Sequence, residues 1–235
     1  WWKSISRNKR CITLNLGKAE GAEIFKELCR TADAVVENYR PGTFERWGIG
    51  EEVLRKINPK LVMLRISGFE QTGPYANRAG FGRVAEAMAG LTNLIGETDG
   101  PPMTPGYPLG DLIAGIFGAF SVMVALYNRD VRGGKGQAID IALFEAVLRL
   151  LDFDPIQYDQ MDEVHVRSGN SAAYVAPSST FQTSDGKWLT LAASTQSVWL
   201  RLARAVDRED MIGDPRYHEN PDRLARSDEV NGAIG

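Results

Sequence analysis

The sequence predicts an α/β protein whose large domain is a Rossmann-like parallel sheet, followed by a linker and part of a smaller α+β domain. In the first third of the chain, short β-rich segments alternate with amphipathic ones, and this β-α-β-α-β order is typical of a parallel sheet with helices against it. A hairpin pattern follows only in the last quarter of the chain. The chain has 235 residues, of which 43% are hydrophobic, so it carries enough apolar surface for a folded core.

Each element of the alternating region has its own signal. Residues 11–16 (CITLNL) alternate and are β-rich, which predicts a first strand. Residues 19–30 place Ile24, Phe25 and Leu28 on one face, which predicts an amphipathic helix. The remaining expected elements of this region are strands at residues 34–37 and 61–66 and a helix at residues 51–57.

A long apolar helix is the main feature of the middle of the chain. It is expected at residues 111–127. Its most apolar stretch, residues 112–126, predicts a buried core helix and is shorter than the roughly 20 residues that cross a membrane. Around it we expect a helix at 81–95 with Val84, Met88, Leu91 and Ile95 as its apolar stripe, a turn-rich loop at 97–110, a strand at 138–141 and a helix at 144–151.

Changes in composition predict the domain limits. The large domain is expected at residues 1–151, and the sequence turns polar and acidic in a linker at 152–178. Part of a small domain is expected at 179–235. There, Ser184-Asp185-Gly186 is a hairpin signal and residues 197–206 predict a helix.

The two ends of the chain predict a fragment. The sequence begins at Trp1 rather than at a methionine, and it stops at Gly235 without a closing element. We therefore expect a chain truncated at both ends.

Charge and cysteine content narrow the classes of partner. Lys and Arg number 27 against 30 Asp and Glu, a formal net charge of −3, which argues against broad nucleic-acid or membrane-surface binding. Cys11 and Cys29 are too few for a disulfide scaffold and stand outside any CxxC or Cys/His cluster. The sequence therefore predicts no metal site and a reducing, cytoplasmic location.

The segments after the second and third expected strands are the candidate binding loops, because ligands of parallel sheets bind outside the carboxyl ends of the strands. These segments are residues 38–42 (NYRPG) and 67–69 (SGF). Arg40 and Arg46 flank the first loop, and an arginine fork suits phosphate, although solvent-facing arginines are the commoner outcome. Nearby aromatic rings either stack a purine or belong to the core: Tyr39, Phe44 and Trp47.

Asp111 is the main candidate for chemistry. It follows Gly110 and begins the long apolar helix, where a lone Asp is most often an N-cap. The alternative is a nucleophile, because a helix N-terminus keeps a carboxylate ionised and offers N–H groups to an adjacent oxyanion. Glu86, on the preceding expected helix, is interpreted as a solvated or paired surface charge rather than as an acid or base.

Several segments, taken in order, resemble family III CoA-transferases, the CaiB/BaiF group. Residues 8–16 (NKRCITLNL) resemble the family's NKRSITLDL, and residues 32–42 (ADAVVENYRPG) resemble its ADVVVENFRPG. Residues 134–140 (GKGQAID) are similar to GxGQxIDV, and Gly110-Asp111 followed by Ala114-Gly115 resembles the segment with the catalytic aspartate. Each motif alone is modest, but their order and spacing together are specific.

The resemblance implies a function and a set of site residues. Family members move coenzyme A from an acyl-CoA donor to a carboxylic acid acceptor through a covalent aspartyl-CoA thioester, and they form interlocked homodimers. They normally begin with a further strand and continue past the end of this chain, so the resemblance implies that an N-terminal strand of the large domain and the C-terminal portion of the small domain are missing. Coenzyme A is then a substrate, and no metal, nucleic acid or membrane is implied. Carried over by motif position, Asp111 is the nucleophile, Asn38 and Tyr39 line the CoA path, Arg46 meets a CoA phosphate, Leu14 borders the nucleotide, and Phe81 and Trp47 are further CoA contacts.

Two alternatives remain beside the transferase. Racemases of the same superfamily place a His-Asp pair where this chain has Phe81-Gly82, so a CoA-ester racemase or isomerase would need a base that the sequence does not identify. A non-catalytic CoA-binding scaffold is the second alternative, because the chain looks truncated.

Overall fold

The computed structural model describes all residues, Trp1–Gly235, and they form two compact units. Unit 1 comprises residues 1–92 and 104–160, and unit 2 comprises residues 93–103 and 161–235. The segment expected to be a linker, residues 152–178, contains the helix α9 (Phe153–Met161). Most of α9 belongs to unit 1 by its contacts.

Unit 1 is built on a three-stranded parallel sheet, which confirms the predicted α/β class. The strands β1 (Ala34–Glu37), β2 (Val62–Ser67) and β3 (Ala138–Ala142) lie in the order β1-β2-β3. In register, Val36 pairs with Leu64 and Leu64 pairs with Ile139. The central strand β2 is almost fully buried, as expected for a strand covered on both faces.

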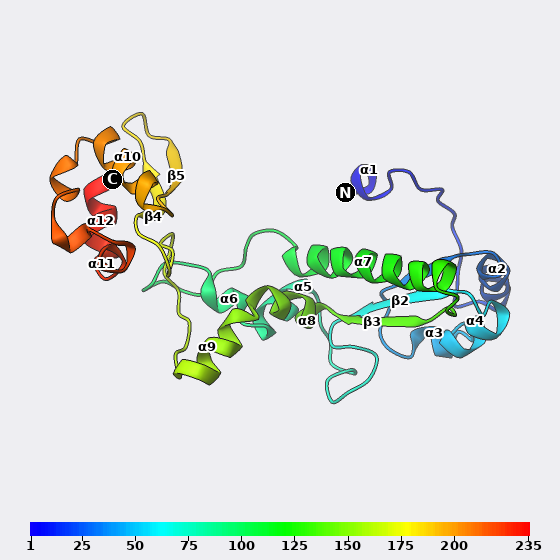
Figure 1. The fold of residues 1–235 in the computed structure, drawn as a ribbon. Helices are drawn as coiled ribbons and strands as arrows, with labels where there is room; N and C mark the ends of the chain where they lie inside the picture. The colour runs from blue at the N-terminus through cyan, green and yellow to red at the C-terminus, as the bar shows by residue number, and fades with distance from the viewer. The chain divides into compact units, whose positions relative to one another are not determined.

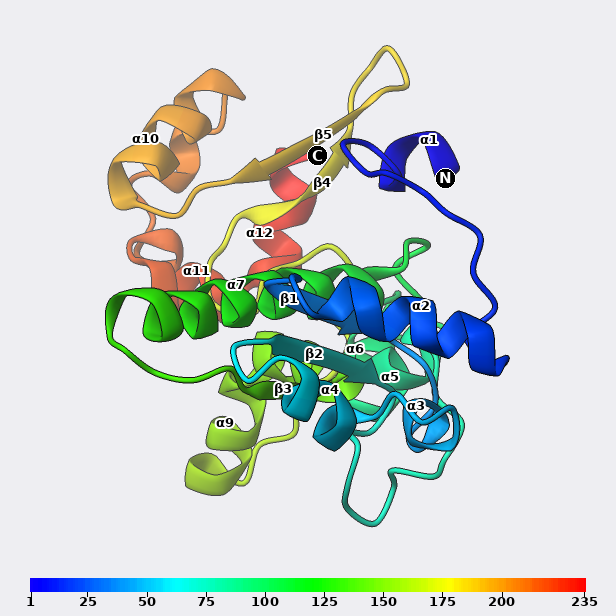
Figure 2. The same ribbon diagram turned by 90° about the vertical axis from the view of Figure 1, so that its right-hand side faces the viewer.

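Helices cover both faces of this sheet. The helices α2 (Ala19–Cys29) and α4 (Glu51–Ile57) share one core with β1 and β2, centred on Phe44, Leu54 and Met63, and Figure 2 shows both helices beside these strands. The helix α7 (Leu109–Val131) runs alongside β2 and β3 (Figure 1). A smaller core, Ala85, Ala114, Leu143 and Ala146, joins α7 to α5 (Gly82–Met88) and α8 (Leu143–Leu148).

Small residues explain how closely α7 approaches the sheet. A Cβ atom added to Gly118 would lie 2.7 Å from Cδ2 of Leu64 on β2. Gly110, Ala114 and Ala125 are also buried on this inward face. The helix backbone therefore packs directly against the strand, with no room for a larger side chain.

The prediction of a buried core helix for this segment is wrong in two respects. The helix has 23 residues, more than expected, because it begins two residues earlier and continues beyond Tyr127. The residues that it buries fully are small, and Ile113 and Phe117 are partly buried against the core, whereas its outward face is apolar and exposed. By length and composition alone α7 could cross a membrane, but core helices of soluble proteins pass the same test. The exposed apolar side chains are Leu112, Ile116, Phe120, Met123, Val124, Tyr127 and Val131.

Four other expectations fail. Residues 11–16 form no strand, because β-rich alternation needs a neighbouring strand to receive its hydrogen bonds. The helix expected at 81–95 is divided into α5 and α6 (Leu91–Leu94), where Gly90 has a φ of +96°. The expected apolar stripe is also wrong: Val84 and Met88 are exposed, whereas Ala85 and Glu86 are buried. In α2, Ile24 and Leu28 are likewise exposed.

Unit 2 contains the expected hairpin and helix. The strands β4 (Ser178–Gln182) and β5 (Trp188–Ala192) are antiparallel, and α10 (Gln196–Ala205) follows. Its core surrounds the fully buried Trp199. The remaining short elements of the chain are α1 (Trp2–Ile5), α3 (Thr43–Arg46), η1 (Arg149–Leu151), η2 (Glu209–Met211), η3 (Pro215–Tyr217), α11 (Asn220–Leu224) and α12 (Ser227–Ile234).

Candidate functional site

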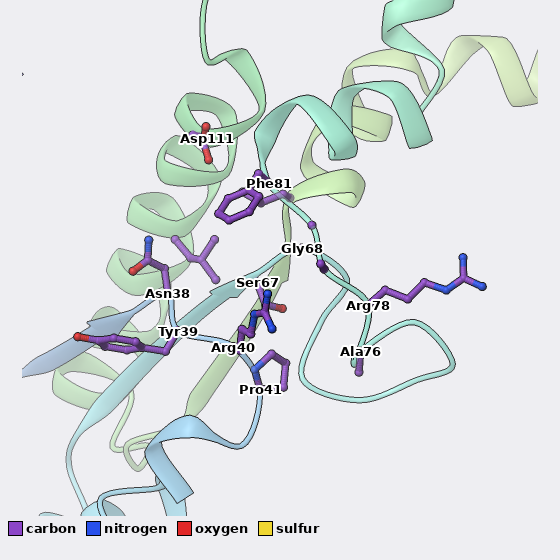
Figure 3. A pocket seen from close by; sticks show the side chains of 14 residues that line it. Asn38, Tyr39, Arg40, Pro41, Ser67, Gly68, Ala76, Arg78, Phe81 and Asp111 are labelled. Carbon is purple, nitrogen blue, oxygen red and sulfur yellow. The ribbon is translucent and has the colours of Figure 1, made fainter. Parts of the chain in front are cut away.

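A cavity of about 240 Å³ lies at the carboxyl ends of β1 and β2 in unit 1. This is the place where ligands bind to open parallel sheets. The volume is below that of a typical small-molecule site, so the cavity suits the reacting end of a ligand rather than a whole nucleotide. Figure 3 shows its main lining residues: Asn38, Tyr39, Arg40, Pro41, Ser67, Gly68, Ala76, Arg78, Phe81 and Asp111.

Asp111 lies in the first turn of α7 but is not its N-cap. The N-cap position is occupied by Pro108, so the capping interpretation of Asp111 is wrong. No hydrogen bond of the structure involves the Asp111 carboxylate, which lines the cavity. The N-terminal end of a helix favours negative charge. In this first turn the N–H groups of Leu109, Gly110 and Leu112 donate to Tyr107, Glu86 and Pro108, which leaves the N–H of Asp111 as the donor without an acceptor. A carboxylate in this position is free to react.

The surroundings of Asp111 raise the pKa of its carboxyl group. Partial burial is the larger cause, and the negative charge of Glu86 is the second. A more basic carboxylate is a better nucleophile once it is ionised. The expected activity therefore falls as the pH drops through a pKa that lies above the usual value for Asp.

The backbone of α5 crowds the Asp111 carboxylate. A Cβ atom added to Gly82 would lie 2.5 Å from Oδ2 of Asp111, and one added to Gly110 would lie 3.1 Å from the carbonyl oxygen of Gly82. The two helix starts therefore approach each other through a pair of glycines. This contact leaves no space for a side chain between α5 and the carboxylate.

Gly82→Ala is expected to displace the Asp111 carboxylate and to slow any reaction at it by about 10- to 100-fold, since a misplacement of about 1 Å has effects of this size. Gly115→Ala is the matched control, because a Cβ atom at Gly115 of α7 meets nothing within 4 Å. The rate of covalent labelling at Asp111 by an acyl-CoA measures the effect. Equal rates in the two variants would contradict the crowding argument.

A buried ion pair holds the loop that carries Asn38 and Tyr39. Nε of Arg65 donates to Oε1 of Glu37 at 2.7 Å, and Nη1 of Arg65 donates to Oε1 of Glu45 at 2.8 Å. The other carboxylate oxygen of Glu37 accepts the N–H of Tyr39 at 2.7 Å. Arg65 on β2 thus anchors the end of β1, and the end of β1 anchors the loop.

The structure brings four of the predicted site residues to one cavity. Asp111, Asn38, Tyr39 and Phe81 all line it, although they come from three separate segments (Figure 3). The ring of Tyr39 also meets Trp47 edge-to-face, with centroids 5.0 Å apart.

The other three predicted contacts lie outside this cavity. Trp47 is half-buried and packs against the core that α2 and α4 share with the sheet. Arg46 is exposed, and its Nη2 donates to Oγ1 of Thr43 at 2.9 Å. Leu14 is half-buried in the segment before α2. Their contacts with a nucleotide stay predictions.

Two further polar residues belong to this site: Ser67, from a loop that the sequence predicted to bind ligand, and Glu86, which the sequence predicted to be a surface charge. Ser67 ends β2 and lines the cavity, and its buried hydroxyl has no hydrogen-bond partner. Its place at the carboxyl end of the central strand is the signal that made residues 67–69 a candidate binding loop. Glu86 is fully buried beside Asp111, and no pattern in the sequence marked it as buried. No group of three or more His, Cys, Asp or Glu side chains is placed to hold a metal ion.

Comparisons with known proteins agree with the resemblance in the motifs. The model of CoA-transferase family III matches residues 1–235. The β subunit of succinyl-CoA–L-malate CoA-transferase from Chloroflexus aurantiacus is 44% identical over 99% of this chain and 58% of its own length. The succinyl-CoA–D-citramalate CoA-transferase of the same organism is 40% identical over 100% of this chain and 58% of its own length.

Solved structures show the same likeness. The crystal structure of a CaiB/BaiF family protein from Brucella suis superimposes with a TM-score of 0.82 and 32% identity, covering 96% of this chain and 59% of that one. The chain spans about 58% of the length of the curated relatives. With a family model that matches its whole length, the chain belongs to CoA-transferase family III.

Proposed function

We propose that this chain carries the reacting site of a CoA-transferase that moves coenzyme A from an acyl-CoA donor to a carboxylic acid acceptor, with Asp111 as the nucleophile. One observation carries the proposal: a carboxylate without a hydrogen bond, in the first turn of a long helix, opens onto the cavity at the carboxyl ends of the sheet. The activity of the whole protein is part of the proposal, because the chain spans 58% of its relatives' length.

The first half of the proposed reaction charges the aspartate. An Asp111 oxygen attacks the thioester carbonyl of the donor and forms a C–O bond. The tetrahedral oxyanion then collapses, and the C–S bond breaks with its electron pair leaving on CoA thiolate, which gives an acyl–aspartyl anhydride. The thiolate attacks the aspartyl carbonyl of this anhydride, releasing the donor acid as a carboxylate and leaving an aspartyl-CoA thioester.

The second half repeats these steps in reverse with the acceptor. The acceptor carboxylate attacks the aspartyl thioester and expels CoA thiolate, forming a new anhydride. The thiolate then attacks the acyl carbonyl of the acceptor, which gives the product thioester and frees Asp111 as a carboxylate. No net proton is required, so the site needs a nucleophile and oxyanion donors rather than a general base. The first turn of α7 offers one N–H without an acceptor for that second role, that of Asp111.

The absence of a racemase-like pair supports the transferase over its superfamily alternative. A proton transfer at the α-carbon of a CoA ester needs a base on each side of that carbon. Phe81 and Gly82 stand where racemases have His and Asp, and Phe81 lines the cavity. Among the cavity-lining residues, Asp111 is the single carboxylate and no histidine is present.

Covalent trapping tests the proposal. Succinyl-CoA is the first donor to use, because two relatives are named for it. The protein is incubated with succinyl-CoA and quenched with hydroxylamine, and modified carboxylates are located by peptide mass spectrometry. Conversion of Asp111 to its hydroxamate, absent without the CoA ester, is the expected result. If the folded protein binds coenzyme A but Asp111 stays unmodified, the proposal fails and the result favours a non-catalytic CoA-binding scaffold.

The CoA path gives a separate prediction about Arg46. If Arg46 meets a CoA phosphate, Arg46→Met is expected to weaken coenzyme A binding by roughly 10- to 100-fold, because this factor corresponds to the free energy of one hydrogen bond to a charged group. Binding of pantetheine, which has no phosphate, is expected to be unchanged. Titration calorimetry measures both, with Arg30→Met at the exposed end of α2 as the control. Equal losses for the two ligands, or for neither, would contradict the phosphate contact.

We also infer a cytoplasmic protein that works as an interlocked homodimer. Two free cysteines, Cys11 and Cys29, support a reducing location. The exposed apolar face of α7 supports the homodimer, because a second subunit would cover these side chains. Sedimentation of the full-length protein decides the assembly, and a monomer at micromolar concentration would contradict it.

A further inference from the structure

Glu86 is a buried carboxylate on the helix that packs against the start of α7. Its side chain is fully buried on α5. Its Oε1 accepts the backbone N–H of Gly110 at 2.9 Å, and Gly110 directly precedes Asp111 in the chain. Its other oxygen, Oε2, is buried without a hydrogen-bond partner.

This placement contradicts the surface charge expected from the sequence. Burying a carboxylate is costly unless its charge is stabilised by donors or dipoles. Here the stabilising groups belong to the first turn of α7, whose N–H groups lack partners within the helix and whose dipole favours an anion. The carboxylate of Glu86 therefore lies at the helix end that also carries Asp111.

We propose that Glu86 is a positioning residue for Asp111: its carboxylate holds the Gly110 N–H and so fixes the first turn of α7 with the Asp111 side chain directed over the cavity. This inference rests on the proposed role of Asp111 as the nucleophile. Glu86 does not line the cavity and touches no substrate, so it acts through the backbone of α7.

The backbone contact on the other side of Asp111 completes the argument. The start of α5 at Gly82 leaves no room for a Cβ atom beside the Asp111 carboxylate. Four residues later, on the same helix, Glu86 binds the N–H of Gly110. One turn of α5 thus makes both contacts: Gly82 restricts the position of the Asp111 side chain, and Glu86 fixes the backbone next to Asp111.

The charge of Glu86 has a second, measurable consequence. Beside partial burial, it is a cause of the raised pKa of Asp111. The other charged side chains on the packed helices are Arg83 on α5 and Glu145 on α8, both exposed, and Arg129 and Asp130 at the far end of α7. The loops that line the cavity with Asp111 carry Arg40 and Arg78. Neutralising Glu86 is therefore expected to lower the pKa of Asp111 and to extend its reactivity to lower pH.

Two substitutions separate the hydrogen bond from the charge. Glu86→Gln keeps an oxygen for the Gly110 N–H, so the rate of Asp111 labelling by succinyl-CoA at neutral pH is expected to stay within about threefold, with its acid limb moved to lower pH. Glu86→Leu leaves the Gly110 N–H without an acceptor. It is expected to slow labelling by about 100-fold, with the affinity for coenzyme A unchanged. Glu52→Gln, at an exposed position on α4, is the matched control.

A spectroscopic measurement keeps this inference separate from the nucleophile proposal. An amide proton bound to a carboxylate is strongly hydrogen-bonded, so the Gly110 amide proton is expected to resonate downfield and to move upfield in Glu86→Gln. If wild type is never labelled at Asp111, the proposed function fails, whereas the Gly110 resonance still reports on Glu86. An unchanged Gly110 resonance in Glu86→Gln, or a wild-type labelling rate and acid limb in Glu86→Leu, would overturn the positioning role. If Glu86→Leu does not fold, the Gly110 resonance in Glu86→Gln alone decides whether Glu86 positions Asp111.

Discussion

Asp111→Asn is expected to lower CoA transfer by about 10⁴-fold or more, because it removes the nucleophile on which both halves of the reaction depend. Asn has nearly the same shape but cannot form the anhydride. The Asp111 carboxylate lines the cavity and lies beside Gly82, so the substitution leaves the surrounding packing intact. Transfer from succinyl-CoA to a panel of carboxylic acids, followed by chromatography of the CoA esters, measures the loss.

The same substitution is expected to stabilise the fold, which distinguishes it from a damaging core change. Burial and the charge of Glu86 raise the pKa of Asp111 in the folded state. A group with a raised folded-state pKa adds stability below its unfolded pKa and loses that contribution as the pH rises through its folded pKa. Replacing the ionised group should therefore raise Tm at neutral pH and have less effect in acid. A variant that is inactive and also less stable at pH 7 would contradict this account.

Arg65→Met is expected to destabilise unit 1 by about 3–5 kcal/mol, because it leaves the carboxylate of Glu37 buried without its cation. The side chains of Arg65 and Glu37 are only 8% and 2% exposed. Loss of the pair also frees the loop that Glu37 holds through the N–H of Tyr39. We therefore expect weaker coenzyme A binding together with lower stability.

Glu45→Gln is the matched control for this pair. The side chain of Glu45 is 47% exposed, so its bond to Arg65 contributes no more than about 1 kcal/mol. Urea unfolding, combined with hydrogen exchange of the β1 and β2 amides, assigns the change to unit 1. A similar small effect for Arg65→Met and Glu45→Gln would show that the buried pair does not hold the loop.

The parallel sheet could be predicted because each strand carries a local signal. Residues 34–37 and 61–66 are short and apolar, and the helices between them have recognisable ends. The segment at 11–16 carries an equally strong β pattern but has no partner strand in the structure. Strand formation depends on a neighbour, and local sequence does not report whether one is present.

The faces of the helices were harder to predict than the helices themselves. In α5 the apolar Val84 and Met88 are exposed, whereas Glu86 is buried. In α7 the fully buried residues are glycines and alanines. A search for hydrophobic periodicity does not mark such small residues as the buried face of a helix. Close backbone packing selects small side chains, and a helix end stabilises a buried carboxylate; both effects depend on tertiary structure.

The site could be predicted only in part, because tertiary structure also decides which residues meet there. Asp111, Asn38 and Tyr39 follow motifs and meet at one cavity. Ser67, in the predicted loop at residues 67–69, lines the same cavity. Glu86 does not line it and was not predicted to be buried, because its contact with Gly110 joins segments that are distant in the sequence.

Oxygen exchange tests the central claim, that Asp111 is the covalent nucleophile, most directly. The full-length protein is turned over with succinyl-CoA and an acceptor acid whose carboxylate carries ¹⁸O. In the proposed reaction, the last anhydride breaks so that one acceptor oxygen remains on Asp111. The account predicts a mass increase of about 2 Da after a single turnover in the peptide that contains Asp111, since each transfer exchanges one carboxylate oxygen, and of about 4 Da after many turnovers, when both oxygens have been exchanged. Transfer that proceeds with this peptide unshifted would show that the acceptor reacts without a covalent bond to Asp111.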